Sequence, residues 1–168
     1  MSWYNKHRPT TPDQYVWADQ KLRESIMEWI DNPLKYPSII LHGSTGTGKT
    51  SLTQLIIAML GERVDVQWIR ASLTNGVEMI RDQVVAFCER GGFHELKIVV
   101  LDEADRLSAA AQEMLRNVMD QFDDDVRFIF TCNYFDKIVP PGRSLRRRAD
   151  GDSSAAGRRT KRSARTAQ

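Results

Sequence analysis

The sequence has few of the features that mark secreted, membrane or metal-cluster proteins. Its two cysteines, Cys88 and Cys132, lie far apart and form no CxxC arrangement. This spacing argues against a disulfide framework or a cysteine metal site and suits a reducing compartment. No apolar run approaches the ~20 residues of a membrane span, and residues 1–8 lack the apolar stretch of a signal peptide. We therefore expect a cytoplasmic protein, in the host cytoplasm if it is viral and in the nucleus if it is eukaryotic.

An excess of positive charge is also lacking over most of the chain. Residues 1–142 contain 15 Lys and Arg against 20 Asp and Glu, whereas residues 143–168 contain 9 against 2. An argument for nucleic-acid binding from charge alone would therefore depend on the tail. Residues 142–168 also have almost no apolar side chains, so they cannot offset the entropy of ordering, and we expect them to be disordered.

Before this tail, short apolar runs alternate with segments of helical periodicity. The predicted strands are 38–41, 64–69, 98–101 and 126–131, and the predicted helices are 20–32, 49–60, 75–90 and 109–122. Asp19 and Ser108 are expected to cap two of these helices, and Gly61 to end a third. The alternation predicts an α/β fold with a parallel sheet between helices. We expect an extended segment over residues 1–18, a core over 19–141 and the tail over 142–168.

A glycine-rich loop joins the first predicted strand to the next helix and fits the pattern G-x-x-x-x-G-K-[ST] at every fixed position. Glycines let successive backbone N–H groups face a phosphate, and the helix directs its positive end there. Lys49 can reach the β- and γ-phosphates of ATP, and Thr50 can offer a hydroxyl to Mg²⁺. A glycine-rich turn that binds nothing is the alternative, which the flanking elements disfavour. The predicted nucleotide-binding residues are Gly43, Ser44, Thr45, Gly46, Thr47, Gly48, Lys49, Thr50 and Ser51.

Two carboxylates, Asp102 and Glu103, directly follow the apolar run 98–101. A buried strand would carry them to the carboxyl edge of the sheet, where α/β folds bind ligands. Asp102 can hold Mg²⁺, and Glu103 can polarise an attacking water. A core strand that exits into a polar loop would give the same pattern. The glycine-rich loop about fifty residues earlier favours the site, and the Asp-Glu order favours hydrolysis over binding alone.

The next predicted strand is followed by Asn133, which could position water together with Glu103. The predicted catalytic residues are Glu103, Asn133 and Lys49. A turn-forming asparagine would explain the residue equally well when taken alone. The other two motifs favour the functional role.

Longer stretches resemble the small subunits of AAA+ clamp loaders, the replication factor C and T4-type phage group. The residues that carry the resemblance are Trp3-Tyr4-Asn5-Lys6-His7-Arg8-Pro9, Gln14 to Gln20, Asp102-Glu103-Ala104-Asp105, Ala110-Ala111-Gln112, Leu115-Arg116 and Thr131-Cys132-Asn133-Tyr134. The resemblance covers about residues 2–141. It implies an Mg²⁺-dependent ATPase that loads a sliding clamp onto primer–template DNA. It also implies other clamp-loader subunits as partners in a hetero-oligomer.

The same resemblance implies further binding residues. Tyr4, Arg8, Pro9 and Val16 are expected to border the adenine. DNA contacts are expected from Ser72, Thr74, Asn75 and Arg81, although a helix cap and a solvated arginine would explain these residues as well. Arg70 stands where the family often has an asparagine that holds the catalytic glutamate back.

The pattern of the family stops near residue 141. We therefore expect the last sheet strand, the helical lid and the collar to be missing, with one sheet edge left unpaired. The tail is either a natural basic arm that binds nucleic acid or the product of a reading-frame shift near codon 141, which the abrupt break favours. Two other functions stay open: another AAA+ machine such as a helicase loader, and a nucleotide-binding remnant without turnover.

Overall fold

The computed structural model describes residues 9–73, 75–94 and 96–138 and the backbone of 144–148. Its centre is a five-stranded sheet in the order β2-β3-β4-β1-β5, in which every neighbouring pair is parallel. The strands are β1 (Ser38–His42), β2 (Val64–Arg70), β3 (Leu96–Asp102), β4 (Val126–Cys132) and β5 (Ser144–Arg148). The predicted α/β fold with a parallel sheet is confirmed.

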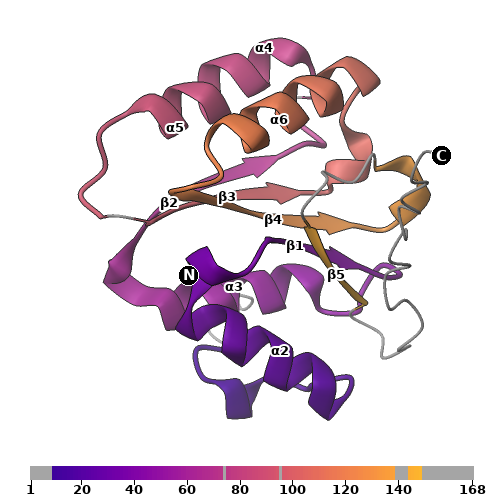
Figure 1. Cartoon of the computed structure of the whole chain (residues 1–168). Helices are drawn as coiled ribbons and strands as arrows, with labels where there is room; N and C mark the ends of the chain where they lie inside the picture. Colours follow the sequence, from indigo (N-terminus) through magenta and orange to yellow (C-terminus); the bar gives the residue numbers. More distant parts are fainter. Residues whose placement is uncertain (1–8, 74, 95, 139–143, 149–168) are drawn as a thin grey trace, which may run out of the picture.

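Helices cover both faces of the sheet (Figure 1). One face carries α2 (Gln20–Asp31) and α3 (Lys49–Leu60), and the other carries α4 (Val77–Met79), the π-helical segment η4 (Ile80–Val85), α5 (Ala86–Glu89) and α6 (Ala109–Gln121). Short 3₁₀ turns complete the chain: η1 (Pro12–Gln14), η2 (Pro33–Lys35), η3 (Gly61–Arg63), η5 (Ala104–Arg106) and η6 (Phe135–Lys137). Within the described residues, every helix is too short or too polar to cross a bilayer.

The helix ends follow from local side chains. The Asp19 carboxylate accepts a hydrogen bond from the Leu22 N–H at 2.7 Å, and the Ser108 hydroxyl accepts one from the Ala111 N–H at 3.2 Å. Gly61 ends α3 with a φ of 60°, a conformation that costs a glycine little. All three predicted helix ends are confirmed. The helix predicted over 75–90 spans 77–89 and contains a π-helical stretch in its middle, which its sequence periodicity did not indicate.

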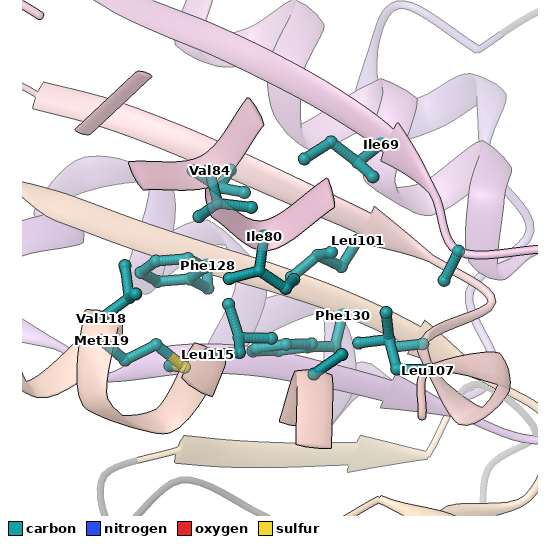
Figure 2. Packing of buried hydrophobic residues seen from close by; sticks show 14 of the residues in the cluster. Ile69, Ile80, Val84, Leu101, Leu107, Leu115, Val118, Met119, Phe128 and Phe130 are labelled. Atoms are coloured by element: carbon teal, nitrogen blue, oxygen red, sulfur yellow. The ribbon is translucent and has the colours of Figure 1, made fainter. Parts of the chain in front are cut away.

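Successive side chains of each strand point to opposite faces of the sheet, and they divide the core into two layers. On β3, Val99 and Leu101 face α4, α5 and α6, whereas Ile98 and Val100 face α2 and α3. Figure 2 shows the first layer, where side chains of the helices pack on the sheet. Its labelled residues are Ile69, Ile80, Val84, Leu101, Leu107, Leu115, Val118, Met119, Phe128 and Phe130. Both faces of the central strands are therefore buried, as the continuous apolar runs predict.

The prediction that the last sheet strand is missing is wrong. Ser144–Arg148 forms β5, which pairs in parallel with β1 from Ser38↔Ser144 to His42↔Arg148. The prediction of disorder over 142–168 is therefore also wrong for these five residues, and the outer edge of β1 is paired. The physical reason is that an edge strand joins a sheet through main-chain N–H and C=O groups, so an Arg-rich sequence without an apolar run can still pair.

The amino end of the sheet is held by two buried cations. Arg127 is 5% exposed, and its guanidinium donates to the carbonyl oxygens of Pro33, Leu34 and Tyr36 at 2.7–3.1 Å. Lys97 is 6% exposed, and its Nζ donates to the carbonyl oxygens of Cys88 at 2.6 Å and Arg90 at 2.5 Å. These bonds tie the segments before β1 and after α5 to the sheet.

Candidate nucleotide-binding site

The glycine-rich loop 43–48, called the P-loop below, connects β1 to α3 at the carboxyl end of the sheet. Gly46 and Gly48 have φ angles of 86° and 82°, a region that other residues enter only with strain. A Cβ atom on Gly48 would also lie 3.1 Å from the Tyr15 hydroxyl oxygen, so a side chain there would press on Tyr15. The loop therefore needs these two glycines for its path, and α3 begins directly after the second one, at Lys49.

Lys49 is buried at the first position of α3. Its Nζ donates to the carbonyl oxygens of Gly43 at 2.9 Å and Ser44 at 2.7 Å. The Thr47 hydroxyl donates to the same Ser44 oxygen at 2.9 Å. The ammonium group is thus held against the curled loop, beside the amino terminus of a helix whose dipole also favours an anion.

Asp102 ends β3 and is buried. Its Oδ1 accepts hydrogen bonds from the Thr50 hydroxyl at 3.2 Å and the Thr131 hydroxyl at 2.5 Å. These three residues come from α3, β3 and β4, which the parallel register brings together at one edge of the sheet. The structure therefore joins the P-loop to the acidic strand end through a direct contact between side chains.

Glu103 follows with a left-handed backbone, at φ 57° and ψ 43°. Among the described residues it is the only non-glycine with positive φ. Its N–H donates to the Thr131 hydroxyl oxygen at 3.0 Å, and its carboxylate lies 4.0 Å from Nε of Arg106. The strained turn is consistent with a functional position, because such conformations concentrate at active sites.

These groups line one crevice of about 290 Å³. Its lining residues are Thr45, Gly46, Gly48, Lys49, Thr50, Ser51, Asp102, Glu103, Thr131, Cys132 and Asn133. A neighbouring hollow shares Thr45 and Asn133 with it and also includes Gly43 and Ser44. The structure thus brings together residues of all three predicted motifs. The roles assigned to them in nucleotide binding and catalysis stay predictions.

The oxygen groups of the crevice fit Mg²⁺. Thr50 and Asp102 supply a hydroxyl and a carboxylate, the hard oxygen ligands that this ion prefers. Within the described part of the chain, His, Cys, Asp and Glu form no cluster of three that would hold a metal alone. One carboxylate beside a phosphate-binding loop suits an ion that keeps several waters and shares its shell with substrate phosphates.

Cys132 lies at the crevice with a protonated thiol. The pKa of Cys132 is raised to about 12, mainly by burial and in smaller part by the Asp105 carboxylate, while the Lys49 ammonium opposes the shift. The thiolate is the reactive form of cysteine, so a pKa this high makes Cys132 a packing residue. Cys88 is buried as well, so both thiols are core residues of the fold.

Some predicted site residues lie elsewhere. Val16 is 91% exposed, and neither Val16 nor Pro9 lines the crevice, so their contact with adenine stays a prediction. Thr47 is also absent from the lining and acts through its bond to Ser44. Tyr4 and Arg8 lie outside the described residues.

The predicted DNA contacts are on the surface near the same edge. Ser72 and Asn75 are exposed in the loop after β2, and Arg81 is exposed on η4. Thr74 lies outside the described residues. Arg70 is in register with Asp102, so it stands one strand away from the acidic pair. All of these contacts with DNA stay predictions.

Sequence reasoning missed two residues of the site. Thr131 bonds to both acidic residues, and Tyr15 packs under Gly48 with its hydroxyl 3.5 Å from the Gly48 carbonyl oxygen. Thr131 is a polar residue inside the apolar run 128–132, and this break in the run could have marked it as a candidate site residue. Nothing in the local sequence connects Tyr15 to a loop 33 positions away.

A parallel α/β sheet, a glycine-rich loop before a helix, and an acidic strand end that contacts it define a P-loop domain of the nucleotide-binding class. The family described as "ATPase family associated with various cellular activities (AAA)" matches residues 39–152. This chain therefore belongs to the AAA family of ATPases.

Relatives by sequence are named replication factor C subunits. The chain is 35% identical over 144 residues to the replication factor C small subunit of Thermoplasma volcanium, covering 83% of this chain and 45% of that protein. It is 33% identical over 149 residues to replication factor C subunit 5 of Homo sapiens, covering 83% of this chain and 42% of that protein. The chain thus spans less than half the length of these relatives.

Solved structures show the same fold. A RuvB mutant of Thermotoga maritima matches with a TM-score of 0.64 at 17% identity, over 83% of this chain and 48% of that chain. The Thermotoga maritima RuvB Holliday junction branch migration motor matches with a TM-score of 0.62 at 18% identity. At this identity the likeness extends to the fold alone.

Proposed function

We propose that this chain is the ATP-binding and ATP-hydrolysing part of a DNA polymerase clamp loader, with ATP and Mg²⁺ as cofactors. The observation that carries the proposal is the 3.2 Å hydrogen bond between the Thr50 hydroxyl and the Asp102 carboxylate, which joins the P-loop to the acidic strand end. A hydroxyl and a carboxylate that meet beside a buried lysine make the arrangement that a magnesium-bound triphosphate requires.

Each residue then has a distinct role. Lys49 exchanges its loop carbonyl partners for the β- and γ-phosphates, and the amides of Gly43–Ser51 surround the same oxygens. Thr50 and Asp102 hold Mg²⁺, which neutralises phosphate charge when bound. Glu103 orients and polarises the attacking water, and Asn133 positions that water from the end of β4.

The clamp-loader assignment is supported by the similarity to replication factor C small subunits over 83% of this chain. We propose that the chain assembles with other clamp-loader subunits and uses ATP to place a sliding clamp on primer–template DNA. In this proposal Tyr4, Arg8, Pro9 and Val16 border the adenine.

In the same proposal, DNA phosphates are contacted by Ser72, Thr74, Asn75 and Arg81. The loop before α4 and the exposed face of η4 present polar groups at the edge of the sheet that carries the crevice. Such contacts would fix the position of the backbone of the DNA rather than read its sequence.

The experiment follows a fluorescent ATP analogue with Mg²⁺ and then its hydrolysis, with and without primer–template DNA and partner subunits. The wild-type chain should bind, and Glu103→Gln should bind equally well but lose turnover in the assembled complex. The matched control is Glu113→Gln, because Glu113 is an exposed glutamate on α6 outside the crevice. Its turnover should equal the wild type.

A wild-type chain without affinity for the analogue would contradict the ATPase proposal, as would full turnover by Glu103→Gln. A pull-down with a sliding clamp in the presence of ATP tests the clamp-loader assignment separately. Binding of ATP without capture of the clamp would leave the chain an ATP-binding AAA protein and exclude this partner.

A further inference from the structure

Thr131 is a buried hydroxyl at the carboxyl end of β4, with 1% of the residue exposed. Its Oγ1 donates to Oδ1 of Asp102 at 2.5 Å and accepts from the N–H of Glu103 at 3.0 Å. A hydroxyl has one hydrogen to donate, and an ionised carboxylate can only accept. The two bonds therefore have fixed directions, and one oxygen atom connects two consecutive acidic residues.

The bond to Asp102 restrains the carboxylate. Oδ1 accepts from both the Thr131 and the Thr50 hydroxyls, which approach from β4 and α3. Of the two bonds, the one to Thr131 is shorter and comes from a fully buried strand, whereas Thr50 is partly exposed and faces the crevice. When Thr50 turns to a metal ion, Thr131 is the partner that still holds the carboxylate in place.

The bond to Glu103 restrains a strained backbone. A left-handed conformation of a residue other than glycine is strained and persists only where surrounding contacts fix it. The Glu103 N–H would have no ladder partner at this turn, and the Thr131 oxygen supplies one. This turn directs the main chain so that Glu103 lines the crevice next to Asp102.

We propose that Thr131 is a positioning residue that sets the metal-holding carboxylate and the water-polarising glutamate with a single hydroxyl group. The inference rests on the proposed function, because it assigns Asp102 to Mg²⁺ and Glu103 to water. Removing the hydroxyl should weaken both roles together, whereas loss of either carboxylate alone affects one of them.

The test compares Thr131→Val, which keeps the shape and removes the hydroxyl, with Thr131→Ser, which keeps the hydroxyl. The readout is the Mg²⁺ concentration that half-saturates binding of a fluorescent ATP analogue to the full chain. Thr131→Val should raise this concentration by roughly 10-fold or more, the usual cost of removing a hydrogen-bond partner of a metal ligand. Thr131→Ser should stay within about 2-fold of the wild type.

Ser38→Ala is the matched control. Ser38 is a buried hydroxyl on β1 that also joins two strands, since it accepts from the Phe128 N–H at 3.0 Å, but it does not line the crevice. Its loss should lower thermal stability without moving the Mg²⁺ midpoint. If Thr131→Val does not fold, Thr131→Ala replaces it, because alanine removes the hydroxyl without setting a methyl group against Asp102.

A Thr131→Val protein with the Mg²⁺ midpoint of the wild type would overturn the proposal, and so would a Thr131→Ser protein as impaired as Thr131→Val. Both outcomes leave nucleotide binding by the wild type intact. A wild-type chain that binds no nucleotide contradicts the proposed function instead, so the two failures are distinct.

Discussion

The two ends of the sheet hold buried lysines that bond in the same way and differ in what surrounds them. Lys97, at the amino end, donates to two carbonyls at the close of the helix 77–89. Lys49, at the carboxyl end, donates to two carbonyls of the loop beside the crevice, that of the buried Gly43 and that of the exposed Ser44. A lysine on helix-end carbonyls stabilises the fold, whereas a lysine on loop carbonyls beside an open crevice can exchange them for phosphate oxygens.

The remaining polar groups repeat this division. At the amino end, Arg127 donates to main-chain carbonyls and pairs with the Asp123 carboxylate at 3.6 Å, and Ser38 accepts from a main-chain N–H. At the carboxyl end, Thr50, Thr131 and Asp102 bond to one another around a space. Mutations at the amino end should therefore change stability without changing the affinity for nucleotide. Mutations at the carboxyl end should change the affinity for nucleotide with little effect on stability.

The largest effect on stability is expected from Arg127→Ala. The guanidinium satisfies several buried carbonyls at once, and its removal leaves them without partners, so we expect a loss of about 3–5 kcal/mol. Urea unfolding followed by circular dichroism measures this loss. The nucleotide affinity of the folded fraction should stay unchanged, and a stable Arg127→Ala protein with weakened nucleotide binding would reverse the comparison.

Lys49→Ala should have the largest effect on binding. Two charge-assisted hydrogen bonds to phosphate are lost, which predicts a fall in ATP affinity of roughly 100-fold. Thermal unfolding without nucleotide should shift less than in Arg127→Ala, because Lys49 has two carbonyl partners and one of them belongs to the exposed Ser44. If Lys49→Ala bound ATP as tightly as the wild type, the proposed difference between Lys49 and Lys97 would be wrong.

Lys97→Met, the counterpart at the amino end, should destabilise by about 1–3 kcal/mol through the unpaired carbonyls of Cys88 and Arg90. Methionine keeps most of the aliphatic volume, so packing is conserved. Titration with the ATP analogue should give the affinity of the wild type. A drop in affinity comparable to that of Lys49→Ala would contradict the structural role.

The smallest effect on stability is expected from the ionisation of the two thiols, Cys88 and Cys132. Burial raises the pKa of Cys132 to about 12 and that of Cys88 to about 11. The native state therefore holds these protons more tightly than the unfolded chain. This contribution to stability is complete below the ordinary thiol pKa of 9.0 and is lost as pH rises toward 12.

The same shift predicts the reactivity of the thiols. At pH 8 both should react with iodoacetamide roughly 100-fold more slowly in the native protein than in urea, because the thiolate is the nucleophile. Mass spectrometry of the alkylated cysteines provides the rates. Fast native labelling of Cys132 would show that the crevice edge opens.

The parts that the sequence predicted correctly depend on local patterns. Asp19 and Ser108 cap the helices that directly follow them, and the P-loop and the pair at 102–103 are recognisable within a few residues. Their meeting in space also followed from the rule that ligands of α/β sheets bind beyond the carboxyl ends of the strands.

What could not be predicted depends on partners far apart in the chain. Thr131 reaches Asp102 across 29 positions, so its place in an apolar run marks it as unusual but does not indicate its partner. The local sequence does not show that Arg127 is buried, because the carbonyl groups that it bonds lie 91–94 positions away, in the segment before β1. The strand β5 was missed because pairing through the main chain leaves no apolar signal in residues 144–148.

The central claim is that the P-loop and the acidic strand end form one magnesium-dependent nucleotide site. A double-mutant cycle of Thr50→Val and Asp102→Asn tests it most directly, with Mg²⁺-stimulated binding of the ATP analogue as the readout. Because both side chains would serve the same ion, the double variant should lose little more than the worse single variant. If the fold-losses of affinity in the two single variants multiply in the double variant, the two residues act at independent sites, and this result would contradict the account.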